Sequence, residues 1–284
     1  MVISDEMVSM ESTLLLLIDL KKKRMEQIRN ELKTLPEGSL YLTKSRGKTY
    51  FIHGLKSSRK GISSQEDMIY RLARKKYLTI LLREQQSSMD AIRRTASHSR
   101  KGSRPSSAAS SLETLLRKYG EAGLDILRIT CSEEQYRWAR DDYWSNPVEF
   151  SGDVYETYSG VRIRSKSEQA IGNELELRGI PYRYEPAVRL DVSWMTGVDH
   201  LSDGRHKRFY PDFVILTASG ERIIWEHLGR VDLPSYRAHN MEKISAYRQS
   251  GIVDDAHLIL TFEKDLQRLS DLHRIIDLRI MPYM

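Results

Sequence analysis

The chain is poor in cysteine and has no long apolar run. Cys131 is its single cysteine, so an intrachain disulfide and a cysteine-based zinc site are both excluded. The longest apolar run, Leu14 to Ile18, is far shorter than the roughly 20 residues that a bilayer-spanning helix needs. No basic segment followed by an apolar segment marks a signal peptide. We therefore expect a cytoplasmic protein without a membrane partner.

Several common catalytic motifs are also missing. His200, His206 and His239 do not have the His-Glu-x-x-His spacing of a zinc peptidase. No glycine-rich phosphate loop occurs, and Ser167 and Ser235 lack the Gly-x-Ser-x-Gly context of a hydrolase nucleophile. The sequence thus argues against zinc peptidases, P-loop enzymes and serine hydrolases.

Positive charge is abundant, and it is concentrated in the first part of the chain. The 284 residues carry a net charge of +6. Residues 1–118 contain 24 Lys and Arg against 12 Asp and Glu, whereas residues 119–284 contain 21 against 27. A basic extension on an acidic body suits a polyanionic partner, but a solubilising, partly disordered extension would have the same composition. Both interpretations remain open at this point.

Residues 1–94 are predicted to form a basic helix–hairpin–helix extension. Apolar residues recur at helical spacing between Leu14 and Leu35. Two β-prone runs within residues 39–53 flank a short Gly-containing turn, which is typical of a hairpin. A second, strongly basic helix with one apolar stripe is expected from about residue 64 to Ile92.

The extension is expected to be separate from the rest of the chain. Residues 95–111 are small, polar and without periodicity, which predicts a flexible linker. Residues 112–284 are predicted to form an α/β domain with a helical lead-in that ends near Trp144. The candidate nucleic-acid contacts are cations of the second basic helix and of the segment before the α/β core: Arg71, Arg74, Lys75, Lys76, Arg164 and Lys166.

From residue 166 the pattern becomes regular. Ser165 or Ser167 offers an N-cap for a helix that Gly179 closes. A hairpin followed by a helical crossover to another strand predicts a mixed sheet flanked by helices. The expected order is a helix over 166–178, strands over 182–190, 208–216 and 221–227, a helix from residue 234 or 235 to 249, and a strand over 257–262.

Two carboxylates stand at one end of the predicted hairpin. Asp212 begins one strand and Glu226 lies near the end of the strand that pairs with it. Antiparallel pairing brings them together, and two such carboxylates repel unless a cation joins them. Oxygen ligands suit Mg²⁺ or Mn²⁺, which can activate water and neutralise charge on a phosphodiester. Alternatively, Asp212 is a turn residue and Glu226 an exposed strand end.

This stretch, with Pro211-Asp212, the later Glu226 and the α-β-β-β-α-β order, resembles the PD-(D/E)xK, or restriction-endonuclease-like, nuclease superfamily. The resemblance covers about a hundred residues. It implies a metal-dependent nuclease acting on DNA more readily than on RNA, with Mg²⁺ or Mn²⁺ held by Asp212 and Glu226. It also implies that Glu168, on the helix that opens the core, completes the metal shell; otherwise Glu168 stabilises the helix dipole.

The chain departs from the motif at one position. The superfamily places a lysine two residues after the second acid, where this chain has Leu228. Lys243 is the best candidate to replace it, because Lys243 and Tyr247 resemble a Gln-x-x-x-Tyr element of some relatives. His227 is a second candidate for a catalytic role, although a histidine beside Trp225 is more often structural.

Three functions compete on the sequence alone. The first is a metal-dependent nuclease. The second, suggested by the missing lysine, is a nucleic-acid-binding protein that keeps an inactive nuclease-like fold. The third is an interaction protein whose basic helices bind an acidic protein or an anionic surface. Substrate, sequence preference and pathway do not follow from the residues.

Overall fold

The structure is a computed structural model that describes residues 3–96, 111–150, 152–194, 201, 203–229, 234–252 and 257–284. The chain is a mixed α/β protein that divides into two units, Met1–Thr130 and Cys131–Met284. Within the described part of the chain, no helix combines the length and the apolar character that crossing a membrane requires.

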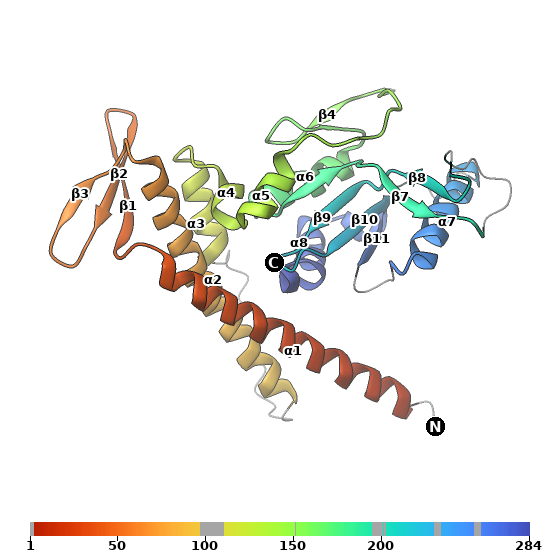
Figure 1. Ribbon diagram of the computed structural model, residues 1–284, viewed down its shortest axis with the longest axis horizontal. Coiled ribbons are helices and arrows are strands. Elements are labelled where there is room, and N and C mark those ends of the chain that lie inside the picture. The colour runs from red at the N-terminus through yellow and green to blue at the C-terminus, as the bar shows by residue number, and fades with distance from the viewer. Residues whose placement is uncertain are drawn as a thin grey trace. The chain divides into compact units, whose positions relative to one another are not determined.

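The N-terminal unit contains long helices and one small sheet (Figure 1). The expected helix, hairpin and helix are present. A short third strand, β3, extends the hairpin and was not predicted. The elements are α1 (Ile3–Thr34), β1 (Ser39–Ser45), β2 (Lys48–Gly54), β3 (Arg59–Gly61), α2 (Glu66–Ala96), α3 (Ser111–Gly120) and α4 (Ile126–Thr130).

The last two helices of this unit change the predicted domain boundary. Leu112 and Leu116 of α3 are buried in the same apolar cluster as Ile28 of α1 and Leu72 of α2. The boundary therefore follows Thr130 rather than lying within residues 95–111. Most of that predicted linker, residues 97–110, lies outside the described residues.

The C-terminal unit is built on a four-stranded sheet in the order β11-β10-β9-β6. β9 is antiparallel to both β6 and β10, and β10 is parallel to β11. The elements of this unit are α5 (Glu133–Arg140), β4 (Tyr155–Glu156), β5 (Arg162–Ile163), α6 (Lys166–Leu177), β6 (Tyr182–Tyr184), β7 (Val188–Asp191), β8 (His206–Phe209), β9 (Phe213–Leu216), β10 (Arg222–Leu228), α7 (Pro234–Gln249), β11 (Leu258–Phe262) and α8 (Leu269–Arg279), with 3-10 turns at Glu263–Leu266 and Met281–Tyr283.

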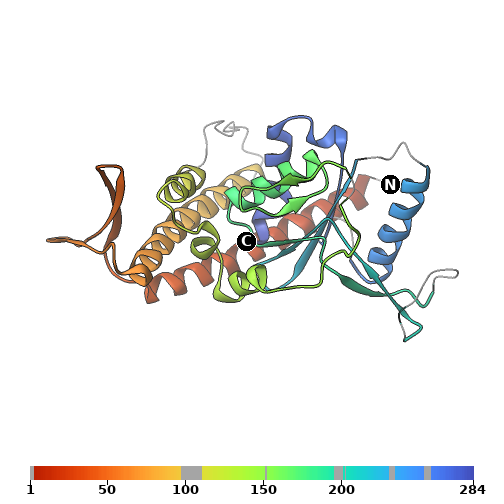
Figure 2. The same cartoon turned by 90° about the horizontal axis from the view of Figure 1, so that it is seen from above.

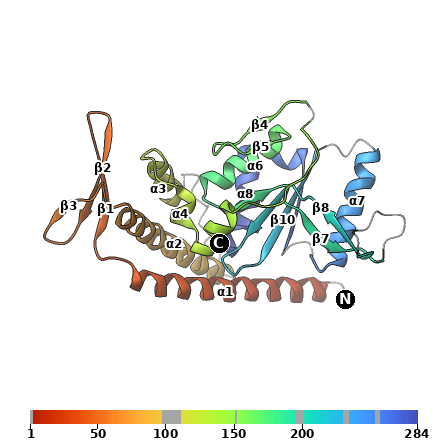
Figure 3. The ribbon, with the colours of Figure 1, turned by 45° about the horizontal axis from the view of Figure 1, so that its top comes forward.

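Helices cover both faces of this sheet (Figure 3). Phe213, Ile215 and Trp225 pack with residues of α6 and α8 in one cluster. Val214 and Ile224, which alternate with them, pack with α7 and the β7–β8 hairpin in another. This alternation determines which side chains at the end of the β9–β10 hairpin point toward α7.

Two predicted strands are each broken into two. The strand expected over 182–190 is divided into β6 and β7 at Glu185, whose φ is +44°, and Pro186 follows. The strand expected over 208–216 is divided into β8 and β9 by Tyr210-Pro211-Asp212. β7 and β8 then pair with each other as a separate two-stranded sheet. The break places Asp212 just before β9, facing Glu185.

Candidate active site

The acidic pair lies together at one end of the β9–β10 hairpin, as predicted. Phe213 pairs with Trp225, so the preceding Asp212 lies opposite Glu226. The Asp212 Oδ2 atom accepts a hydrogen bond of 2.6 Å from the backbone N–H of His227. The backbone N–H of Glu185 donates to the Asp212 carbonyl at 3.0 Å. Asp212 is thus held by β10 and by the residue that follows β6.

Helix α7 supplies two donors to Glu226. Lys243 Nζ donates to Glu226 Oε2 at 2.8 Å and to the Tyr210 carbonyl at 2.9 Å. The Tyr247 hydroxyl donates to Glu226 Oε1 at 2.6 Å. Glu226 is only 2% exposed and Lys243 only 8%, so this is a buried ion pair. Lys243 and Tyr247 are one helical turn apart, which places both on the helix face that covers the sheet.

The charges of this site are not balanced by Lys243 alone. The pKa of Asp212 is raised well above its usual value, mainly because surrounding protein atoms remove its carboxylate from water. The charge of Glu226 raises it further, Lys243 opposes the rise, and Glu168 adds to it. Burial and Glu226 likewise raise the pKa of Tyr247. Asp212 is therefore exposed to the charges of two other carboxylates and one lysine, an arrangement that would favour an additional cation.

Glu168 reaches this site from the first turn of α6. Ser165 caps the helix by accepting from the Glu168 backbone N–H at 3.2 Å. The Ser165 hydroxyl donates to Glu168 Oε1 at 2.8 Å, and the Tyr184 hydroxyl donates to Oε2 at 2.6 Å. Burial and the Glu168 charge raise the pKa of Tyr184. The sequence did not predict that Tyr184 contacts Glu168, because no pattern in the strand of Tyr184 indicates that contact.

His227 lies on the opposite face of β10 from Glu226. Its Nδ1 is 3.1 Å from Thr261 Oγ1, and its Nε2 is 3.2 Å from Glu263 Oε1. Since an ionised carboxylate only accepts, Nε2 carries a proton in this contact. The imidazole thus belongs to a hydrogen-bonded group under α6, where Ser167 also donates to Glu263. His227 therefore contacts Asp212 through its backbone N–H, whereas its ring contacts Thr261 and Glu263.

Leu228, two residues after Glu226 where the resemblance would lead one to expect a lysine, is buried. It shares the face of Glu226 by strand alternation. A cation is nevertheless present beside Glu226, because Lys243 approaches from α7. The structure thus brings together Asp212, Glu226 and Lys243 from the predicted set, with Glu168 near enough for its charge to raise the pKa of Asp212, and it leaves the His227 ring apart.

Within the described residues, no group of three or more His, Cys, Asp or Glu side chains is arranged to hold a metal ion. Both oxygens of Glu226 and both oxygens of Glu168 accept from protein donors. Asp212 has one oxygen in such a bond.

Comparison with protein-family models, curated proteins and solved structures found no match to this chain.

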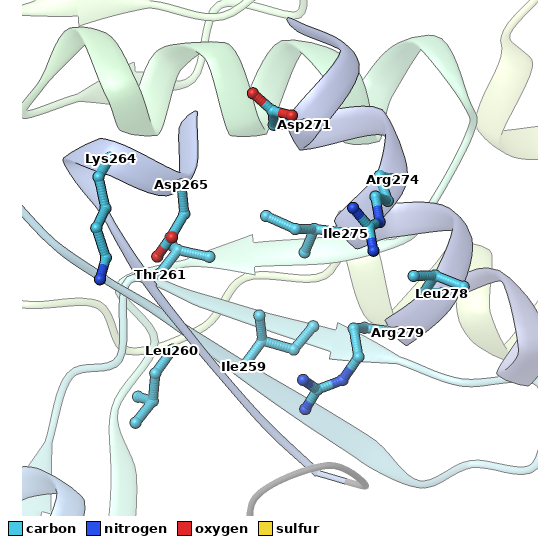
Figure 4. Close-up of a pocket in the computed structure, with 10 residues that line it drawn as sticks. All are labelled: Ile259, Leu260, Thr261, Lys264, Asp265, Asp271, Arg274, Ile275, Leu278 and Arg279. Carbon is cyan, nitrogen blue, oxygen red and sulfur yellow. The ribbon is translucent and has the colours of Figure 1, made fainter. Parts of the chain in front are cut away.

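A pocket of about 460 Å³ lies elsewhere, between β11 and α8 (Figure 4). Asp265 and Asp271 line it together with Lys264, Arg274 and Arg279. Arg279 also donates to the Leu258 carbonyl at 3.0 Å. The mixed charges select no ligand class, and the acidic pair is not part of the lining.

Four of the six cations predicted to contact nucleic acid are engaged within the protein. Arg74 forms an ion pair with Glu31, and Arg164 pairs with Glu185 through its Nε at 3.0 Å. Arg71 donates to the Thr34 carbonyl at 3.1 Å and Lys75 to the Pro36 carbonyl at 2.7 Å. Lys76 and Lys166 are exposed. The prediction rested on charge alone, and a role of these six cations in binding nucleic acid stays a prediction.

Proposed function

We propose that residues 131–284 form a metal-dependent nuclease of the PD-(D/E)xK type that hydrolyses phosphodiester bonds of DNA or RNA. The single observation that carries this proposal is the convergence of Asp212, Glu226 and Lys243 at one end of the β9–β10 hairpin. The order α6, β6, β9, β10, α7, β11 supports it, with β7–β8 as an insertion.

The residues present fit Mg²⁺ or Mn²⁺ by their chemistry. Mg²⁺ is commonly held by one or two carboxylates and several waters, so a group of three protein ligands is not required. Asp212 and Glu226 would hold the ion, and Glu168 would add negative charge nearby. When bound, the metal would neutralise phosphate charge and lower the pKa of a coordinated water.

The remaining residues of the site would orient and stabilise. Tyr247 fixes one oxygen of Glu226 and thereby the rotation of its carboxylate. Lys243 places its ammonium against Glu226, so it would stabilise an attacking hydroxide and charge developing on the phosphate oxygens. The ammonium can share a proton with water, which a guanidinium does poorly. Lys243 would thus perform the task of the motif lysine from another element.

A specific observation favours the second candidate, an inactive nuclease-like protein that binds nucleic acid. Lys243 and Tyr247 together occupy both oxygens of Glu226, and Leu228 is buried where the motif places a lysine. The hydrogen bonds of Glu226 to Lys243 and Tyr247 could persist in a protein that has lost catalytic activity.

Cleavage with and without metal separates the two candidates. Labelled DNA and RNA, each single- and double-stranded, would be incubated with the full chain in Mg²⁺, in Mn²⁺ and in EDTA. The proposal expects metal-dependent cleavage of at least one substrate and none in EDTA. Binding without cleavage in both metals would favour the inactive protein and contradict the nuclease.

A further inference from the structure

The sheet of the N-terminal unit carries positive charge without any acidic residue. Residues 38–65 contain six Lys and Arg and no Asp or Glu. All six side chains are exposed: Lys44, Arg46, Lys48, Lys56, Arg59 and Lys60. None of them forms an ion pair with an acidic group in the described part of the chain. Arg74 on α2, by contrast, pairs with Glu31.

The two faces of this sheet differ. Leu40, Leu42 and Phe51 point to one face and pack on the core that includes α2. Side chains that alternate with them point to the other face, where Tyr41 is 46% exposed and Tyr50 is 43% exposed. Two tyrosine rings on the open face of this sheet thus keep apolar area in contact with water, area that a bound aromatic group could cover.

The Tyr41 ring is held in place. A side-chain carbon at Gly54 would come within 2.4 Å of the ring, so only glycine lets the tyrosine lie against the strand. The Arg59 guanidinium lies 5.2 Å from the ring centre. An aromatic ring and a guanidinium plane, both pre-positioned, are the groups on which nucleic-acid bases stack.

The turn between β1 and β2 presents a second group of cations. Arg46 and Gly47 have φ of +49° and +74°, the backbone of a tight two-residue hairpin turn. Lys44 near the end of β1, Arg46 in the turn and Lys48 at the start of β2 therefore lie at the same end of the hairpin. Figures 1 and 2 show the hairpin of β1 and β2 extending past the ends of α1 and α2 in its own unit.

We propose that this sheet, residues 39–61, binds single-stranded nucleic acid. Tyr41 and Tyr50 would stack on bases, and the six cations would neutralise phosphates. A single strand fits better than a duplex, because the faces of paired bases are covered by their neighbours in the helix. An anionic membrane fits less well, because Leu55 is the exposed aliphatic anchor and the turn is polar.

This surface is independent of the nuclease assignment, and so is its test. Binding is measured with the full chain in EDTA, by anisotropy of labelled single-stranded DNA, single-stranded RNA and duplex DNA of one length, at several salt concentrations. The first variant replaces Lys44, Arg46 and Lys48 by Gln. Its control replaces Lys22, Arg117 and Lys118, which are exposed cations on helices of the same unit, so that the lost charge is equal.

The hairpin variant is expected to bind single strands at least about tenfold more weakly than its control. The slope of log affinity against log salt should fall by about 2, because each phosphate contact contributes about 0.7 for single strands. Equal affinity and slope for the hairpin variant and its control would overturn the proposal.

Stacking is tested by a second pair of variants. Tyr50→Ala should weaken single-strand binding about tenfold and duplex binding much less. Tyr158→Ala, which removes another exposed tyrosine, should have no such effect. Tighter wild-type binding to the duplex, or hairpin-dependent binding to phosphatidylserine vesicles without single-strand binding, would overturn the proposal. Absence of cleavage in Mg²⁺ would leave it standing.

Discussion

At the scale of single residues, the Glu226–Lys243 pair is notable because it is buried. Removing two charges from water is costly, and a buried pair is weak evidence for a stabilising role. Strongly perturbed, buried charges concentrate instead at functional sites. The Glu226 carboxylate forms an ion pair with Lys243 and accepts a hydrogen bond from Tyr247, and the pKa of neighbouring Asp212 is raised. This is why we place the chemistry here.

Lys243 provides the first prediction. Lys243→Ala should lower turnover by about a hundredfold or more, the usual scale for losing one stabilising group. Metal affinity should change little, because lysine is not a ligand. His227→Ala should cost less, because the imidazole contacts Thr261 and Glu263 rather than the acidic pair. Single-turnover rates measure both, and the reverse order would give the catalytic role to His227.

Asp212 gives a pH-dependent prediction. Its pKa is raised in the folded, metal-free protein, so its contribution to stability is complete below the usual pKa of 3.8 and is lost as pH rises through the folded value. Asp212→Asn removes this loss. In EDTA, the variant should be more stable than the wild type at about pH 8, by about 1 kcal/mol or more, and the difference should shrink toward about pH 4. Denaturant unfolding measures this, and parallel stability curves would contradict it.

At the scale of elements, short stretches of sequence were sufficient to predict the helices and turns whose ends are set by capping and turn residues. Ser165 caps α6, and Gly179 follows its end with a φ of +62°. The hairpin turn at Arg46-Gly47 lies between the two β-prone runs, as predicted, and α7 spans the residues over which a helix was expected. Such features depend on residues close in sequence, which a single sequence contains.

Other elements depend on contacts that sequence does not reveal. The helical lead-in expected to end near Trp144 is interrupted, because Ser132 starts α5 with a capping box to Gln135. The sequence did not reveal that Arg74 of α2 pairs with Glu31, because Glu31 is on another helix. The sequence was enough to propose Lys243 as the replacement for the missing lysine. Its distance from Glu226, however, depends on how α7 packs against the sheet.

The cap of α6 is tested directly. Ser165→Ala should lower the free energy of unfolding by about 1 kcal/mol, because it removes the N-cap and a donor to Glu168. Ser167→Ala is the matched control, since Ser167 donates to Glu263 and does not cap the helix. Denaturant unfolding of both variants measures the effect. A larger loss for Ser167→Ala would show that the cap is misassigned.

At the scale of the whole molecule, the two units carry opposite charge. Met1–Thr130 contains 25 Lys and Arg against 14 Asp and Glu, and Cys131–Met284 contains 20 against 25. Positive charge thus lies in the unit without the acidic site. The net charge of Met1–Thr130 suits association with a polyanion, whereas that of Cys131–Met284 does not.

The unit boundary predicts how fragments behave. Residues 131–284 should unfold cooperatively, because their clusters contain no residue before Cys131. A fragment that starts at residue 111 would expose Leu112, Leu116 and Tyr119, which are buried in the N-terminal unit, and should aggregate more. Calorimetry and size-exclusion chromatography compare the two. A folded longer fragment beside an unfolded shorter one would contradict the boundary.

The central claim is that Asp212 and Glu226 serve metal-dependent phosphodiester hydrolysis. The most direct measurement is the cleavage rate of labelled DNA and RNA in Mg²⁺ by the wild type, Asp212→Asn and the control Asp142→Asn, which changes an exposed carboxylate. We predict cleavage by the wild type and Asp142→Asn, and a loss of about a hundredfold or more for Asp212→Asn. Equal rates for all three proteins, or no cleavage by the wild type, would contradict the account.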